Sequence, residues 1–425
     1  MLQIGSLASL GVSFLLSVAL ARVLGRDGYG AYALVISTMT TISLFKRLGQ
    51  DYIVTTRLAA AYARYDSLEI RAALTTFNSI NLWSTLLVIP PALVLAPLIC
   101  GYFYGDAALG DPLRLALLPP IWAMTLATLV VVLQCSRRMV ALTLVENANN
   151  LGLALGGVAL ALAGGGVSGV FSGQAIVSLA FALLAILVYR RVQAGDPLLP
   201  SVGIQLDDLR RAGLVLGSEL RSGLAVALDK NLVSLYPLAP ILLLGALAPT
   251  SEVALLRVAM SYLGVPLLAL SAISRLLMVK LPELHATQPW RMRCFFLQVT
   301  GTGGAISLLI TLPFILLAPW LIELLYGAAF GGAARLVPLL ALDPLLAGFG
   351  IAAGPIFRTY GRNIWAVWAN VVVLTIGLPL AYVLVQSSGL EGAALAYAAL
   401  VTALRAIAYG LCLRIVNAQP SPAAT

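Results

Sequence analysis

The chain has 425 residues, of which 60% are apolar and 10% are charged, and its mean hydropathy is +0.98. So few charged residues cannot cover a globule of this length, which excludes a soluble domain. The net charge is +9, but the basic residues lie in alternate short loops. A nucleic-acid-binding protein would gather them in one patch or tail. The composition therefore indicates a polytopic membrane protein.

Twelve apolar runs reach the length of a membrane span, which takes about 20 residues to cross roughly 30 Å of hydrocarbon. They lie near residues 2–24, 30–50, 74–100, 113–134, 139–163, 167–189, 213–245, 252–279, 294–322, 335–357, 363–385 and 392–415. Residues 19–21 resemble a signal-peptide cleavage site, but no positive charge precedes the first run, so we expect it to remain as a span. The sequence predicts an all-α fold with about twelve transmembrane helices.

Arginines mark the loops that follow the even-numbered runs, and basic loops stay on the cytoplasmic side. These residues are Arg57, Arg64, Arg71, Arg137, Arg138, Arg190, Arg191, Arg210, Arg211, Arg291, Arg293, Arg358 and Arg362. The loops after odd-numbered runs hold little beyond Arg26, Arg114 and Arg335. We therefore expect both termini in the cytoplasm.

Two stretches about half the chain apart repeat each other. At an offset of 222, residues 96–97 and 104–105 match residues 318–319 and 326–327, all Ala-Pro and Tyr-Gly pairs. At an offset of 223, Asn147 matches Asn370, and the Gly-x-x-Gly of residues 166–169 matches residues 389–392. Six runs in each half predict two parallel six-helix bundles around a central cavity.

The repeat also predicts the domain organisation. We place an N-terminal bundle at residues 1–191, a cytoplasmic linker at 192–211, a C-terminal bundle at 212–416 and a disordered cytoplasmic tail at 417–425. The linker prediction follows from its polar composition, which includes Asp196, Pro197 and Pro200.

Catalytic and cofactor motifs do not emerge from the sequence. It has no glycine-rich loop ending in Gly-Lys-Ser/Thr, the motif that cradles nucleotide phosphates. Its one histidine, His285, has no neighbouring ligand in the sequence, and its four cysteines lie far apart. We expect neither an enzyme nor a metal or cofactor site.

Arg257 and Arg275 form the sharpest polar pattern within a predicted span. They lie eighteen residues apart, which is five turns or about 27 Å on one helix face, with Ser261, Gly264 and Ser271 close to that face. A guanidinium donates paired hydrogen bonds to phosphate, so this stripe suits an anionic substrate. The alternative is that the two arginines extend to opposite membrane surfaces as anchors.

Other basic and amide residues extend the predicted substrate path. Lys46 and Arg47 end the second span as a basic entrance, or they serve only to orient it. Arg57 belongs to residues 51–71, which are typical of an amphipathic helix on an anionic membrane surface. Lys230 lies within span seven beside Asp229, where a structural ion pair is the alternative to a binding role.

Carboxylates and amides near span five complete the candidates. Asn147 and Asn150 suit sugar hydroxyls, although asparagines also join helices by hydrogen bonds. Glu146, Asp229 and Asp343 are the candidates for coupling to an ion gradient, since carboxylates within spans can carry protons.

Several segments carry a resemblance to a known family. They are residues 21–33, Leu48-Gly49 and Arg57, residues 228–230, residues 325–327 with Phe330, residues 360–363 and residues 389–396. In order and spacing they are similar to bacterial polysaccharide flippases of the O-antigen type, in the multidrug, oligosaccharidyl-lipid and polysaccharide exporter superfamily. Arg22 lies in the first of these segments and joins the predicted substrate-binding residues.

The resemblance implies a flippase in the bacterial inner membrane. Such a protein moves an undecaprenyl-diphosphate-linked oligosaccharide to the outer leaflet by alternating access, for surface polysaccharide synthesis. Its expected partners are the anionic lipid-linked oligosaccharide and membrane lipids, with a polysaccharide polymerase and glycosyltransferases as further candidates and no nucleic acid. A cation-coupled drug exporter and a non-transporting scaffold for glycan assembly are the alternatives. The first span has no Asp or Glu, in contrast to many drug exporters of the superfamily.

Overall fold

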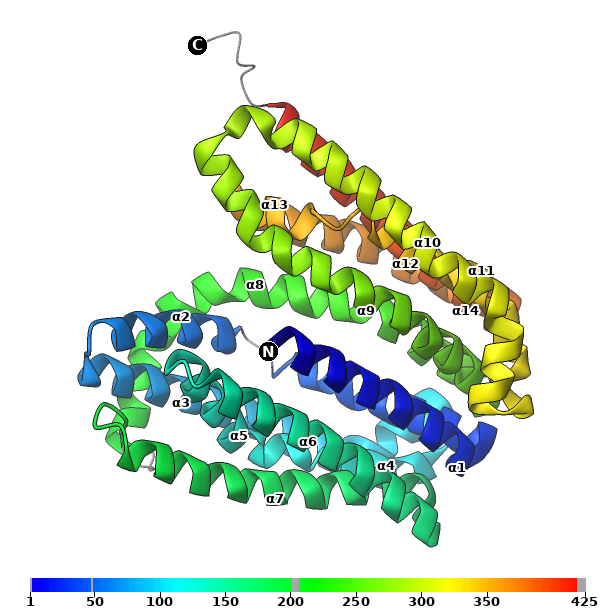
Figure 1. The fold of residues 1–425 in the computed structure, drawn as a ribbon. Helices are drawn as coiled ribbons and strands as arrows, with labels where there is room; N and C mark the ends of the chain where they lie inside the picture. Colours follow the sequence, from blue (N-terminus) through cyan, green and yellow to red (C-terminus); the bar gives the residue numbers. More distant parts are fainter. Residues whose placement is uncertain (1, 47–48, 201–205, 419–425) are drawn as a thin grey trace. The chain divides into compact units, whose positions relative to one another are not determined.

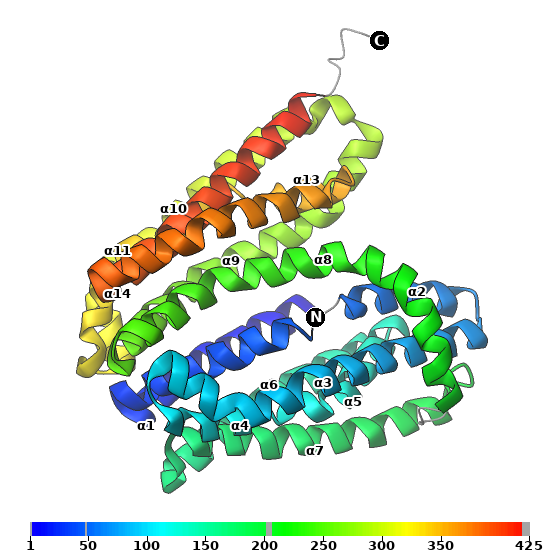
Figure 2. The ribbon, with the colours of Figure 1, turned by 180° about the vertical axis from the view of Figure 1, so that it is seen from behind.

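The computed structural model describes residues 2–46, 49–200 and 206–418, although the side chains of some helical residues, including Arg275, lie outside the description. Within these ranges the regular secondary structure is helical and includes no strand. Figures 1 and 2 show the helices from opposite sides. This confirms the all-α polytopic prediction.

The helices of the N-terminal half include two short irregular turns. The α-helices are α1 (Leu2–Leu44), α2 (Gln50–Ala63), α3 (Ser67–Tyr104), α4 (Gly110–Ala116), α5 (Pro119–Cys135), α6 (Met139–Leu160) and α7 (Gly166–Ala194). A 3-10 turn, η1 (Ala107–Leu109), precedes α4, and a π-helical turn, η2 (Ala161–Gly165), joins α6 to α7.

The helices of the C-terminal half include one long run of short pieces. They are α8 (Leu206–Leu247), α9 (Thr250–Thr287), η3 (Pro289–Arg291), α10 (Met292–Tyr326), η4 (Ala328–Leu336), α11 (Val337–Leu340), α12 (Leu342–Ala347), α13 (Ala353–Thr359) and α14 (Asn363–Asn417). The predicted span 335–357 is therefore broken into several segments, whereas α8, α9 and α10 are continuous.

Seven helical stretches of the described residues are long and apolar enough to cross a membrane. Two of them, Met139–Ala194 and Asn363–Asn417, have 56 and 55 residues, which is more than twice the length of a span. Each is broken by a glycine with positive φ, at Gly166 and Gly389. These breaks fall between predicted spans. The total of twelve spans stays a prediction.

The repeated Gly-x-x-Gly motif builds the same turn in both halves. Gly166 and Gly389 both have a φ of 53°, a conformation that a residue with a Cβ rarely adopts. Three residues later, Gly169 lies against the Leu160 carbonyl and Gly392 against the Leu384 carbonyl, so closely that neither position has space for a Cβ. The sequence repeat thus corresponds to a repeated helical hairpin.

The described chain divides into two compact units. Unit 1 comprises Met1–Leu24 and Leu34–Asn231, and unit 2 comprises Gly25–Ala33 and Leu232–Thr425. Within unit 2, the turn at residues 25–33 packs on the start of α9, where Arg26 Nε donates a hydrogen bond to the Ser251 carbonyl over 3.1 Å. The predicted boundaries at residues 191 and 212 stay a prediction.

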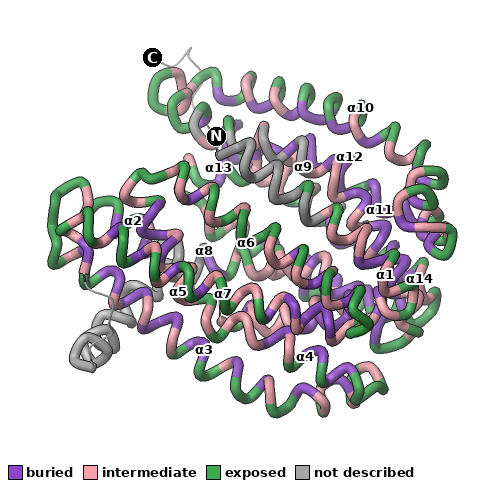
Figure 3. Tube along the Cα trace, turned by 60° about the horizontal axis from the view of Figure 1, so that its bottom comes forward, coloured by how far each residue is buried: buried purple, intermediate pink, exposed green. Residues whose placement is uncertain are grey.

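Each unit has an apolar interior and also exposes large apolar side chains. Phe77 and Leu133 are fully buried in unit 1, and Ile356 and Cys412 in unit 2. Leu87 and Ile376 are 77% and 68% exposed, and Figure 3 shows exposed positions recurring along the helices. Large apolar side chains on the outside suit helices surrounded by lipid.

Candidate functional site

The broken segment between α10 and α14 is the most irregular part of unit 2. Pro338, Pro344 and Pro355 lie in it, and each removes a backbone donor. Carbonyl groups released by the breaks are contacted by side chains of neighbouring helices: Ser307 Oγ donates to the Pro344 carbonyl, and Ser274 Oγ donates to the Ile351 carbonyl over 3.5 Å. Broken helices at membrane depth occur where the backbone is buried in protein or lines a cavity.

A partly buried ion pair lies at this broken segment. Asp343, in α12, is 7% exposed and is the only Asp, Glu, Lys, Arg or His that is buried among the side chains described. Its carboxylate accepts a hydrogen bond from the Tyr397 hydroxyl over 2.6 Å and from an Arg405 nitrogen over 2.9 Å. Gly350 gives the arginine space, since a Cβ there would lie 3.3 Å from Arg405 Cδ.

Two donors already occupy the Asp343 carboxylate, so the structure supports a role in an internal ion pair. Coupling through Asp343 stays a prediction.

Arg257, in α9, is a predicted site residue whose guanidinium group is not fully hydrogen-bonded. It is half-buried, and its Nε is buried without a hydrogen-bond partner in the described part of the chain. Gly264 lies seven residues further along the same face. An added Cβ at Gly264 would meet nothing within 4 Å, so this face of α9 borders open space. The backbone of Arg275 continues the same helix, but its side chain is outside the description.

Two basic residues of unit 1 have structural partners. Arg57, in α2, makes a 2.6 Å ion pair with Glu69 of α3. Lys46, just after α1, donates from Nζ to the Pro120 carbonyl over 2.8 Å. Arg47 lies outside the described residues.

Helix α2 is also joined to the turn that follows α7. The Tyr62 hydroxyl donates to the Asp196 carboxylate over 3.4 Å. Burial raises the pKa of the Tyr62 phenol, and the charge of Asp196 raises it further, so the phenol stays protonated. This contact and the Arg57–Glu69 pair together fix α2 against the rest of unit 1.

The remaining predicted residues also belong to unit 1. Arg22 is exposed on the first arm of α1, and Lys230 is exposed beside the half-buried Asp229 in α8. On α6, Glu146 and Asn150 are exposed and Asn147 is half-buried. By contrast, Arg257, Arg275 and Asp343 belong to unit 2. The predicted site residues therefore form two groups, one in each unit.

Arg405 and Tyr397 were missed by the sequence-based assignment. Arg405 lies thirteen residues into the predicted span 392–415, and an ionisable residue inside a span marks either a binding site or an internal pair. The sequence alone therefore marks Arg405 as a candidate. The identity of its partner, Asp343, does not follow from the sequence, because it depends on how α12 packs against α14.

Comparisons with known proteins give a family and a fold. The family model described as "Polysaccharide biosynthesis protein" matches residues 1–278. No curated protein matches the sequence significantly.

Among solved structures, an inward-facing multidrug resistance MATE family transporter of the MOP superfamily is similar at 14% identity, with a TM-score of 0.77. The match covers 97% of this chain and 95% of that one. The eukaryotic MATE transporter AtDTX14 is 17% identical, with a TM-score of 0.68 and coverage of 98% and 94%.

A MOP superfamily transporter from Pyrococcus furiosus Vc1 (DSM3638) is also similar, at 14% identity and a TM-score of 0.66, with coverage of 98% and 94%. That protein is described as having a binding pocket of reverse polarity that suggests a different function. At these identities the likeness establishes a shared fold.

Proposed function

This chain belongs to the polysaccharide biosynthesis protein family, and we propose that it is a transporter that moves a lipid-linked oligosaccharide across the bacterial inner membrane. The cargo is an oligosaccharide joined to undecaprenyl through a diphosphate, and it passes from the inner to the outer leaflet. The fold shared with MOP superfamily transporters supports the transport step. The family supports the polysaccharide assignment.

The observation that carries the proposal is Arg257. Arg257 lies in the predicted span 252–279, and a guanidinium within a span is costly unless a partner compensates its charge. The Arg257 Nε is buried without such a partner in the described residues. A phosphate oxygen supplies both the missing acceptor and the missing negative charge, because the planar guanidinium matches phosphate with paired hydrogen bonds.

The membrane potential supplies a driving force for this direction of transport. A potential negative inside favours outward movement of an anion by about 2.3 kcal/mol per charge at 100 mV. Two phosphate charges therefore gain roughly 4 to 5 kcal/mol, provided that the arginine does not move with them. We propose alternating access, in which Arg257 binds the diphosphate and then releases it on the outer side.

Export of cationic drugs would require a negatively charged binding site. A cationic substrate needs an available carboxylate, and the buried carboxylate of Asp343 is already occupied by Arg405 and Tyr397. Asp343 is therefore poorly suited to bind a cationic substrate.

Substitution of Arg257 tests the proposal in a strain that depends on this protein for surface glycan. We expect Arg257→Ala to reduce surface glycan at least about tenfold and to accumulate lipid-linked intermediates in the inner leaflet, since a charged hydrogen bond contributes about 1.5–3 kcal/mol. Arg257→Lys keeps the charge but loses the planar fork, so it should retain part of the export. Measurements of glycan and of intermediates give the two readouts.

Arg335→Ala is the matched control. Arg335 is an exposed arginine of η4, in the same unit as Arg257, and its loss should leave export unchanged. Normal surface glycan with Arg257→Ala, at normal protein abundance, would contradict the proposal.

A further inference from the structure

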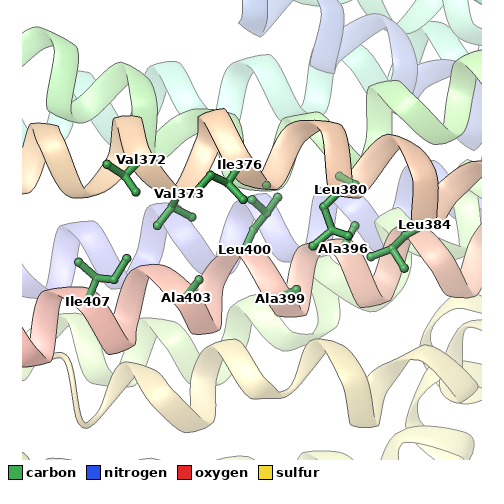
Figure 4. Close-up of a pocket in the computed structure, with 12 residues that line it drawn as sticks. Val372, Val373, Ile376, Leu380, Leu384, Ala396, Ala399, Leu400, Ala403 and Ile407 are labelled. Atoms are coloured by element: carbon green, nitrogen blue, oxygen red, sulfur yellow. The ribbon is translucent and has the colours of Figure 1, made fainter.

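The two arms of α14, before and after Gly389, border an apolar cavity of about 160 Å³ (Figure 4). Its lining is aliphatic and includes Ile376, Leu380, Ala396, Ala399, Leu400 and Ala403. This volume is below the roughly 300–1,000 Å³ of pockets that enclose a whole drug-sized ligand, so the cavity has room for only part of a lipid chain. The helix is one of the candidate membrane spans, so the cavity lies where hydrocarbon chains are the surrounding medium.

The equivalent hairpin of unit 1 is closed at the corresponding place. With the offset of 223, α6 and α7 correspond to the two arms of α14, and Gly156 and Gly173 correspond to Pro379 and Ala396. A Cβ on Gly156 would lie 3.1 Å from the Gly173 carbonyl oxygen, so the two backbones touch there.

The α14 hairpin has larger residues in place of these glycines. Leu380 stands where unit 1 has Gly157, and Leu380 and Ala396 line the cavity. Both hairpins keep the same turn at Gly166 and Gly389. The residues that line the cavity therefore differ from their counterparts in unit 1.

The second arm of α14 also carries the partly buried ion pair on another face. Arg405 is nine residues beyond Ala396, which is two and a half turns, and so lies on the opposite side of the helix. One helix thus presents an aliphatic face to the cavity and a polar face to Asp343.

We propose that this cavity holds part of the polyisoprenoid tail of the transported lipid, an inference that rests on the proposed function. Lateral entry from the bilayer is open, because Ile376 is 68% exposed and Ala399 and Ala403 are exposed. Lipid tails are as apolar as leucine, so preference must come from packing rather than from hydrophobicity.

The shape of the lining favours a branched chain over a straight one. Ala396, Ala399 and Ala403 recur at about one helix turn, roughly 5 Å, and leave hollows between the larger side chains. A polyisoprenoid carries methyl branches at comparable intervals that can fill such hollows. An unbranched acyl chain has no branches to place there.

Photo-cross-linking of the full-length protein tests the occupant. A diazirine side chain replaces Ala403, and the protein is placed in nanodiscs of phosphatidylethanolamine and phosphatidylglycerol that contain undecaprenyl diphosphate without sugar. We expect the isoprenoid to be cross-linked about tenfold above its molar share. Cross-linking in proportion to molar share would identify an ordinary bilayer lipid and overturn the inference.

A cavity-filling pair of variants adds a test without a photoreactive group. Ala403→Phe should lower the retention of labelled undecaprenyl diphosphate about tenfold. Ala180→Phe should change it less than about twofold, because Ala180 is the equivalent exposed alanine of the closed hairpin in unit 1. Equal retention by the two variants would also overturn the inference.

These experiments separate the inference from the function on which it rests. Capture of the sugar-free lipid does not require transport. If capture fails while Arg257→Ala still blocks export, the cavity assignment falls and the proposed function stands. If the lipid is captured but export is independent of Arg257, the proposed role of the arginine falls and the cavity assignment stands.

Discussion

Asp343 and Arg405 illustrate what a single partly buried pair contributes. Removing one partner of a fully buried pair leaves an uncompensated charge and typically costs about 3–5 kcal/mol, and we expect a smaller cost here because the Arg405 side chain is 30% exposed. We expect Asp343→Asn to lower the thermal unfolding temperature of the detergent-solubilised protein clearly. Tyr397→Phe removes only one hydrogen bond to the same carboxylate and should cost about 1–3 kcal/mol.

The double variant Asp343→Asn/Arg405→Gln serves as the control for this prediction. Because both charges are removed together, the double variant should lose less stability than the sum of the losses caused by Asp343→Asn alone and by Arg405→Gln alone. We expect the difference to exceed about 1 kcal/mol. Strict additivity would show that the 2.9 Å pair in the structure is not coupled in solution.

At the scale of single residues, the sequence identified charged groups better than it identified their partners. The sequence predicts Arg257 as a substrate-binding residue because it shares a helix face with Arg275, and it predicts Asp343 as a coupling candidate because it is a carboxylate within a span. The sequence could not distinguish a compensated group from an uncompensated one. The structure shows that Asp343 is paired, whereas the Arg257 Nε has no partner among the described residues.

The hairpin of α6 and α7 offers a test at the scale of elements. A Cβ at Gly173 would overlap the Gly156 carbonyl, so Gly173→Ala forces the helices apart. Overpacking of this kind typically costs about 1–3 kcal/mol. We expect a lower unfolding temperature for this variant, measured in detergent.

Gly264→Ala is the matched control for the hairpin. It makes the same change in a helix where an added Cβ meets nothing within 4 Å. Alanine favours the helix over glycine by about 0.5–1 kcal/mol, so this variant should be as stable as the parent or slightly more stable. Equal destabilisation by both substitutions would mean that the close contact at Gly173 contributes nothing specific.

The sequence predicted continuous helices more reliably than broken ones. Hydrophobic length located α3, α9 and α10, and the breaks at Gly166 and Gly389 fall in the gaps that it left between predicted spans. The run 335–357 was predicted as one span, although it contains three prolines. Its breaks depend on the Ser274 and Ser307 hydroxyls that contact the released carbonyls, and those contacts come from other helices.

At the scale of the whole molecule, the duplication matters most where it is incomplete. Both units keep the glycine turn, but only the α6 and α7 backbones touch at the glycine contact described above, while the α14 arms border a cavity at the equivalent place. The charged residues are also not duplicated, since the predicted pair of Arg257 and Arg275 has no counterpart in span two. Repetition supplies the scaffold, and the departures from it supply the candidate binding surfaces.

Topology is the remaining prediction at this scale, and it depends on whether the longest helices cross the membrane once or twice. A straight helix of 56 residues would extend about 84 Å, far beyond a hydrocarbon core of roughly 30 Å. We therefore expect the stretch Met139–Ala194 to cross twice, turning at Gly166. Its two ends then lie on the same side of the membrane, and the arginines beside them place that side in the cytoplasm.

Reporter fusions distinguish the two possibilities. Truncations after Arg137 and after Gly195 should both be fluorescent when fused to green fluorescent protein and inactive when fused to alkaline phosphatase, which folds only outside the cytoplasm. A truncation after Asp106, in the predicted outer loop, should show the reverse and so controls for export of the reporter. A single crossing would place Arg137 and Gly195 on opposite sides, and with that result the parallel arrangement of two six-helix bundles would fail.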